Sequence, residues 1–176
     1  MVRFSILVVV FLLFVASSYA DHDVDVQSIC KQANDPSFCL VLLKSKPNGV
    51  GGDLKSLAQY TLNVLHTNTS NTLTLINKLI AQSGSDPKKQ NHYKDCLALF
   101  GVEYKGVLGY VLDSLKQFKN SKFNQVGVDM VYLRFHVDDC ISGDPSDTSL
   151  LPKYGNDVRN IADTTLIMTN MLVRRS

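Results

Sequence analysis

The sequence of 176 residues contains no tryptophan and a single glutamate, Glu103, and its charges nearly cancel. The 18 lysines and arginines against 16 acidic residues give a formal net charge of +2. A nucleic-acid-binding protein has a strong basic excess, so we expect no nucleic-acid partner. A glycosidase needs a pair of carboxylates. With one glutamate, that pair would have to be aspartates, and no two of them stand out on one helix face.

The sequence also lacks the short motifs of several enzyme classes. It has no G-x-S-x-G nucleophile motif, no H-E-x-x-H zinc motif and no glycine-rich phosphate loop. Its four cysteines include no C-x-x-C, the spacing typical of zinc sites and thiol redox centres. His136 and Asp138 stand two residues apart, so on a helix their side chains point to different faces. We therefore predict a protein that is not an enzyme, with no catalytic residues, no metal and no cofactor.

Only one long hydrophobic run is present, and it begins the chain. Arg3 precedes the apolar segment 4–15, and Ser18 and Ala20 place small residues where a signal peptidase reads the chain. This pattern predicts a secretory signal peptide over residues 1–20, with an apolar part too short to span a bilayer comfortably. A membrane anchor is the competing interpretation, without a second apolar run to support it. We expect a secreted chain with no membrane partner.

Beyond residue 20 the apolar residues recur at helical spacing, and no stretch alternates convincingly as a strand would. The predicted long helices cover about 54–80, 87–118, 123–141 and 158–172. Short connections make neighbouring helices antiparallel, which predicts an all-α, up-down-up-down four-helix bundle. The bundle domain is expected over residues 51–176, after a small helical hairpin in residues 21–50.

Three glycines fall inside the second predicted helix, at Gly101, Gly106 and Gly109. Each glycine costs roughly 1 kcal/mol relative to alanine in an exposed helix interior. Close approach of a neighbouring helix would explain them. Aromatic residues of the same segment, Phe100, Tyr104 and Tyr110, either line a cavity for a small apolar ligand or form ordinary core.

The four cysteines suit disulfide bonds, because a secreted chain folds in an oxidising compartment. Cys30 and Cys39 enclose only eight residues around a turn, which favours a local bridge between two short helices. Cys96 and Cys140 lie on the second and third long segments. Four cysteines allow three pairings, and spacing alone does not choose among them. On the chain-entropy estimate a short local loop is worth roughly 2.7 kcal/mol and a long one about 4 kcal/mol.

One further modification site is readable. Asn68, Thr69 and Ser70 form an N-glycosylation sequon, which in a secreted chain makes Asn68 a candidate attachment site. The sequon lies near the edge of the apolar stripe of its helix. Glycosylation and a bare asparagine both remain open.

Taken in order, several short motifs resemble the plant invertase and pectin methylesterase inhibitors. The matching stretches are Ile29-Cys30-Lys31, Pro36-Ser37-Phe38-Cys39, Asp53-Leu54-Lys55-Ser56-Leu57, Tyr93-Lys94-Asp95-Cys96 and Asp138-Asp139-Cys140. The resemblance implies a helical hairpin followed by an up-down-up-down bundle, with Cys30 paired to Cys39 and Cys96 paired to Cys140. It also implies a secreted inhibitor in the cell wall or the vacuole. Such an inhibitor would cap the active-site cleft of a carbohydrate enzyme in a one-to-one complex.

The resemblance leaves two targets. Invertase inhibitors share a Pro-Lys-Phe tripeptide between the second and third bundle helices, and Ser121-Lys122-Phe123 is similar to it. An ammonium suits the acidic cleft of a glycosidase and a ring suits an apolar wall, so invertase is slightly favoured as partner. The alternative is that Ser121 caps the third helix and Phe123 packs on the core. Pectin methylesterase, held against the side of the bundle, is the alternative target. A non-inhibitory secreted bundle remains the further possibility.

Overall fold

The computed structural model describes residues 24–47, 49 and 53–175, and its regular structure there is helical throughout. The helices are α2 (Val26–Cys30), α3 (Pro36–Lys44), α4 (Leu54–Gln82), α5 (Pro87–Phe100), η1 (Glu103–Lys105), α6 (Val107–Lys119), α7 (Phe123–Ser142) and α8 (Leu151–Val173). The predicted signal peptide, residues 1–20, lies outside the described residues. None of the helices described is long and apolar enough to cross a membrane.

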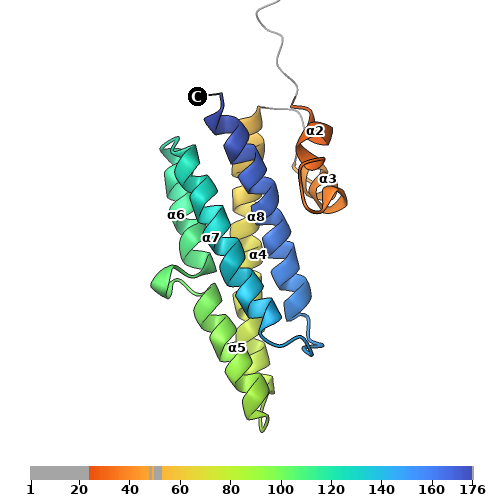
Figure 1. Cartoon of the computed structure of the whole chain (residues 1–176), viewed down its shortest axis with the longest axis vertical. Coiled ribbons are helices and arrows are strands. Elements are labelled where there is room, and N and C mark those ends of the chain that lie inside the picture. The colour runs from red at the N-terminus through yellow and green to blue at the C-terminus, as the bar shows by residue number, and fades with distance from the viewer. Residues whose placement is uncertain (1–23, 48, 50–52, 176) are drawn as a thin grey trace, which may run out of the picture.

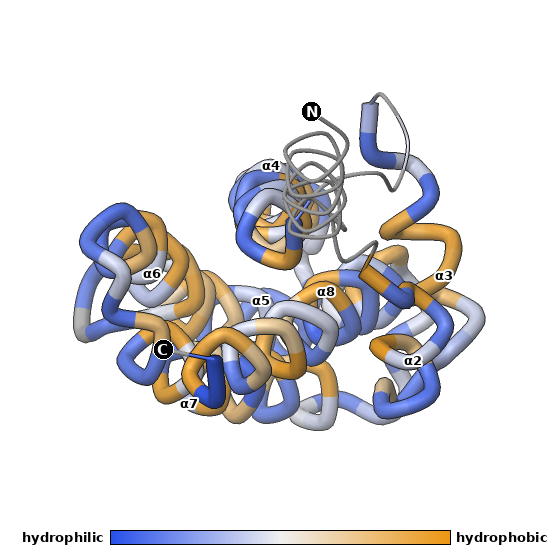
Figure 2. Tube along the Cα trace, turned by 90° about the horizontal axis from the view of Figure 1, so that it is seen from above, coloured by the Kyte–Doolittle hydropathy of each residue, from blue (hydrophilic) through white to orange (hydrophobic). Residues whose placement is uncertain are grey.

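Four helical columns run side by side and form the predicted all-α bundle (Figure 1). α4, α7 and α8 are single helices, whereas α5 and α6 follow each other along one column. Viewed from above, α2 and α3 lie beside α8, outside the bundle (Figure 2). The largest fully buried side chains come from the hairpin and from all four columns: Ile29, Leu43, Leu54, Leu57, Leu62, Leu65, Ile76, Phe100, Phe118, Met130, Leu133 and Leu151.

The second long helix of the prediction is wrong as a single element, because it is broken between α5 and α6. Gly101 is the C-cap of α5 and Gly106 is the N-cap of α6, both with extended backbone. A Cβ added to Gly106 would lie 2.5 Å from the Gly101 carbonyl oxygen and 2.7 Å from that of Leu99. Glycine is therefore required at this position because the last turn of α5, the preceding helix, lies so close.

Aspartate side chains cap the starts of three of the helices. Asp53 accepts a hydrogen bond from the Ser56 amide at the start of α4, and Asp86 accepts two from the first turn of α5. Asp35 does the same at α3, so these carboxylates satisfy amides that a helix start leaves unpaired. α8 begins seven residues earlier than the apolar pattern predicts, at Leu151, whose amide donates to the Ser149 hydroxyl.

Two disulfides join the chain in the pattern that the resemblance implies. Cys30 and Cys39 link α2 to α3 with a Cα–Cα separation of 5.4 Å. Cys96 and Cys140 link α5 to α7 with a Cα–Cα separation of 4.9 Å. All four cysteines are buried, so the bridges form part of the core as well as covalent ties.

Candidate target-binding surface

The turn between α6 and α7 contains the predicted Ser121-Lys122-Phe123 site. The Ser121 amide donates to the Phe118 carbonyl and the Lys122 amide to the Gln117 carbonyl, both at 3.0 Å. This pair of bonds is the Schellman motif, which ends a helix with one residue in the left-handed region. Here that residue is Ser121, at φ +56°, where glycine is usual.

Ser121 is thus the end of α6 and not the cap of α7, which corrects the alternative interpretation of that residue. The N-cap of α7 is Lys122, and no side chain caps the helix. Phe123 is half-buried and meets Phe118 edge to face at 5.2 Å, as that alternative expects. The ammonium of Lys55, from α4, lies 5.7 Å from the Phe123 ring and 3.4 Å from the Ser121 hydroxyl.

The backbone at Ser121 is incompatible with the proline of the tripeptide it resembles. Proline fixes φ near −65° and has no amide hydrogen, whereas Ser121 has φ +56° and its amide is bonded. Lys122 is nevertheless exposed at the tip of the turn. The turn therefore presents an ammonium, but on a different backbone from the one that Pro-Lys-Phe would adopt.

A larger apolar surface lies along the outer face of α7, which sequence reasoning missed. Val128, Val131, Tyr132 and Phe135 are 40%, 39%, 52% and 61% exposed. Their spacing of three and four residues places them in one stripe, which we call the α7 apolar face. The sequence carried this signal as a second apolar series, offset from the core series that includes Val126, Met130 and Leu133.

Aromatic packing and a buried carboxylate support this face. The Tyr132 ring stacks on Tyr110 of α6, with centroids 5.9 Å apart. Burial raises the pKa of Tyr110, and the charge of Asp129 adds to the effect. Asp129 is buried, with its carboxylate accepting hydrogen bonds from Ser114 at 3.2 Å and Gln125 at 3.3 Å. Burial raises the pKa of Asp129 despite those bonds, so a partly desolvated acid lies between α6 and α7.

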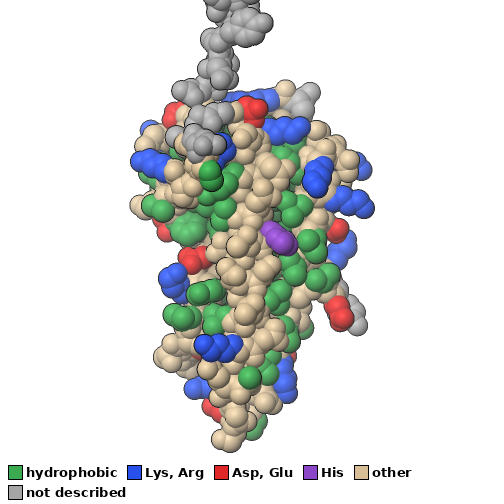
Figure 3. Space-filling view, turned by 180° about the vertical axis from the view of Figure 1, so that it is seen from behind, with side chains coloured by type: hydrophobic (Ala, Val, Ile, Leu, Met, Phe, Trp, Pro, Cys, Tyr) green, Lys and Arg blue, Asp and Glu red, His purple; other side chains and the backbone are tan. Residues whose placement is uncertain are grey.

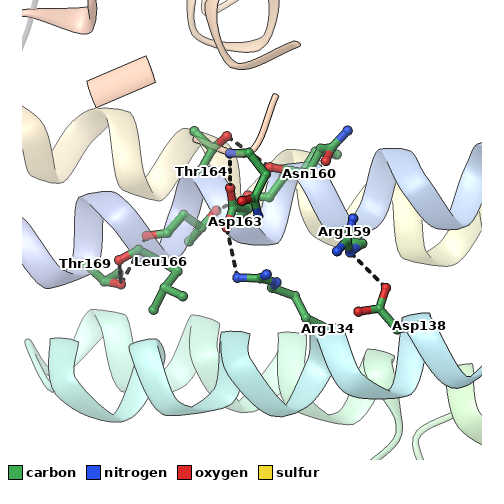
Figure 4. Close-up of polar contacts among 11 residues, drawn as sticks. Arg134, Asp138, Arg159, Asn160, Asp163, Thr164, Leu166 and Thr169 are labelled. Atoms are coloured by element: carbon green, nitrogen blue, oxygen red, sulfur yellow. Dashed lines mark hydrogen bonds and ion pairs between the residues drawn. The ribbon is translucent and has the colours of Figure 1, made fainter. Parts of the chain in front are cut away.

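Two ion pairs hold α7 against α8 (Figure 4). Arg134 donates to the buried carboxylate of Asp163 at 2.9 Å, and Arg159 lies 2.8 Å from Asp138. Asp163 also accepts the backbone amide of Asn34 at 2.9 Å. One carboxylate therefore joins α7, α8 and the turn of the hairpin, which sets the position of the α7 apolar face relative to the rest of the molecule.

The other candidate sites have ordinary local surroundings. Asn68 lies within α4, half-buried, and donates to the Val64 carbonyl at 2.9 Å. Phe100 is fully buried in the core, and Tyr110 is a partly buried residue packed against the core cluster. Two surface hollows, of about 340 and 380 Å³, are lined by neither of these aromatic residues. No cluster of His, Cys, Asp or Glu in the described part of the chain is suited to a metal ion.

Comparison with known proteins identifies the family. The family model described as plant invertase/pectin methylesterase inhibitor matches residues 24–143, from before α2 to the end of α7. The chain belongs to this family. The family is named for inhibition, in line with a chain that is not itself catalytic.

The relatives that match this chain are named as inhibitors of pectinesterase, that is pectin methylesterase, which is one of the two expected targets. The chain is 26% identical to Pectinesterase inhibitor 1 of Arabidopsis thaliana over 170 residues, covering 93% of this chain and 91% of that protein. It is 24% identical to Pectinesterase inhibitor of Actinidia deliciosa over 154 residues, covering 84% and 78%. A mutant form of a pectin methylesterase inhibitor from Arabidopsis has the same fold, with a TM-score of 0.73 and 19% identity. That match covers 84% of this chain and 96% of that structure.

Proposed function

We propose that this chain inhibits pectin methylesterase and does so through the α7 apolar face. The names of its relatives support this target over invertase, which the sequence slightly favoured. The face offers large, exposed, pre-ordered side chains, and Tyr132 is already stacked on Tyr110. Binding hot spots are enriched in such aromatic residues, because they bury much area at little entropic cost.

The exposure of the α7 apolar face is the observation that supports the proposed binding mode. A target seated on it would cover the side of the bundle, the arrangement that the family resemblance implies for pectin methylesterase. Core packing fixes the opposite side of α7, and the ion pairs to α8 keep the stripe in place. A rigid face loses little conformational entropy on binding, which favours affinity.

The test is a titration of two purified enzymes with the purified chain. We expect stoichiometric loss of plant pectin methylesterase activity, with invertase unaffected under the same conditions. Loss of invertase activity alone would overturn the proposal and favour the turn at Lys122 as the target-binding site. Loss of neither activity would favour a non-inhibitory bundle.

Secretion belongs to the same proposal. A chain that acts on a wall enzyme must leave the cell, and residues 1–20 have the pattern of a secretory signal. Expression of the full chain in a plant cell should yield a product in the medium that begins near residue 21. An intracellular product that retains Met1 would contradict this expectation.

A further inference from the structure

One end of the bundle concentrates positive charge, although the whole chain is nearly neutral. Six exposed cations lie there: Lys55, Lys116, Lys119, Lys122, Arg174 and Arg175. We call this end the basic pole. Basic side chains gather at that end of the molecule in Figure 3. Asp53 is the acidic residue at the same helix ends, and none of the ion pairs of the described residues involves the six cations.

Contacts confirm that these cations come from helix ends that meet. Lys55 reaches across from α4 to the Ser121 hydroxyl, beside Lys122. A Cβ added to Gly127, one turn after Phe123, would lie 3.4 Å from the Asn170 side chain. The backbone carbonyl of Asn170 accepts the Arg174 amide at 3.2 Å, at the end of α8. The ends of α4, α6, α7 and α8 therefore form one surface.

Helix electrostatics explain only part of this charge. Lys116 and Lys119 occupy the last turn of α6, and Arg174 is the C-cap of α8, where a cation is favourable. Lys55 and Lys122 instead lie at helix starts, where the positive end of the dipole repels a cation. Contacts with the Phe123 ring and the Ser121 hydroxyl offset this repulsion for Lys55, whereas the helix dipole gives Lys122 no favourable term. An exposed cation at the start of α7, beside five others, points to an external anion.

We infer that the basic pole binds a linear polyanion, and specifically a polysaccharide with carboxylates along its chain. Cations spread over four helix ends suit a partner with repeated charges better than a small anion held in a pocket. The choice of polymer rests on the proposed function, because hydrolysis of methyl-esterified pectin yields carboxylates on the polymer. The inhibitor would then bind the product of its target's reaction and accumulate where that enzyme acts.

The probe is polygalacturonate, with fully methyl-esterified pectin as its uncharged counterpart. We expect the mature chain to bind polygalacturonate at low salt, with affinity that falls steeply as salt is added, and not to bind the esterified polymer. The triple variant K116Q/K119Q/K122Q should lose about tenfold or more in affinity. The matched variant K78Q/K88Q/K89Q removes the same charge from exposed lysines near the other end of α4 and should bind like the parent.

The single variant K122Q separates weaker binding from loss of folding, because it removes only a cation at a helix start. That change leaves stability unaltered or slightly higher, so weaker binding by K122Q reports the lost contact. Equal losses in the two triple variants, binding to the esterified polymer, or no binding at low salt would overturn the inference. Tighter binding to anionic phospholipid vesicles than to polygalacturonate would do the same. Polymer binding is measured without enzyme, so a failure to inhibit pectin methylesterase would be seen separately.

Discussion

At the scale of single residues, Ser121 holds a backbone conformation that its side chain disfavours. A non-glycine residue in the left-handed region costs roughly 1 kcal/mol, and the Schellman bonds of the α6 end hold it there. The positive φ of Ser121 therefore shows that this turn is the end of α6, because a proline at the same position would require a negative φ.

Substitution of Ser121 tests this geometry. Ser121→Gly should raise the free energy of unfolding by up to about 1 kcal/mol, because glycine enters the left-handed region without the Cβ clash. Ser121→Pro should lower it by about 3 kcal/mol or more, since proline conflicts with φ +56° and removes the amide bonded to Phe118. Urea denaturation measures both. A proline variant as stable as the parent would contradict the turn described.

Asp129 should give stability a dependence on pH. Burial raises its pKa above 3.8, so the folded chain holds the proton to higher pH than the unfolded chain does. The contribution of this group to the free energy of unfolding therefore falls as pH rises through the raised pKa. Asp129→Asn should flatten that decline, as measured by denaturation across about pH 4 to 7. Asn124→Ala, an exposed change on the same helix that alters no titratable group, is the control and should leave the slope as it is.

Among the helices, α7 carries apolar side chains on two sides, one buried and one exposed. Its core side packs through Val126, Met130 and Leu133, whereas Tyr132 and Phe135 face outward. Asp163 fixes this helix by accepting from Arg134 and from the hairpin amide of Asn34. The hairpin and the helix that bears the α7 apolar face are therefore coupled through one carboxylate.

Removal of that carboxylate should loosen both attachments. Asp163→Ala is expected to lower the free energy of unfolding by about 3 kcal/mol, because it leaves Arg134 and a backbone amide without their partner. Hydrogen exchange should show faster opening of α2 and α3. Asp157→Ala, which breaks the more exposed pair with Lys153, should cost no more than about 1 kcal/mol. Similar losses in the two variants would argue against a coupling role for Asp163.

The sequence predicted elements better than it predicted their interruptions and their outer faces. Asp53 and Asp86 marked helix starts because a short acidic side chain satisfies free amides, a local rule. The break at Gly106 arises because the chain folds back against the Gly101 carbonyl. The period of the apolar residues carries no information about such a contact. The α7 apolar face was hidden because core and exposed apolar residues have the same helical period, and only packing separates them.

At the scale of the whole molecule, two disulfides close loops of different size. The Cys96–Cys140 bridge spans 44 residues and joins two columns, whereas Cys30–Cys39 spans 9 within the hairpin. The double variant C96A/C140A should lose about 4 kcal/mol of stability, and C30A/C39A about 2.7 kcal/mol, on the chain-entropy estimate. Denaturation of each variant beside the parent measures the order. A larger loss from the hairpin bridge would show that local packing, not loop length, dominates.

In the proposed function, the α7 apolar face binds and inhibits pectin methylesterase. The most direct measurement is the inhibition constant of the double variant Tyr132→Ala/Phe135→Ala against that enzyme. We predict at least about a tenfold rise, because exposed aromatic anchors carry most of the energy of such an interface. Val41→Ala/Leu150→Ala, which trims side chains 71% and 57% exposed elsewhere, should inhibit like the parent. An unchanged inhibition constant in the aromatic variant, with the parent fully active, would show that the enzyme does not bind through the α7 apolar face.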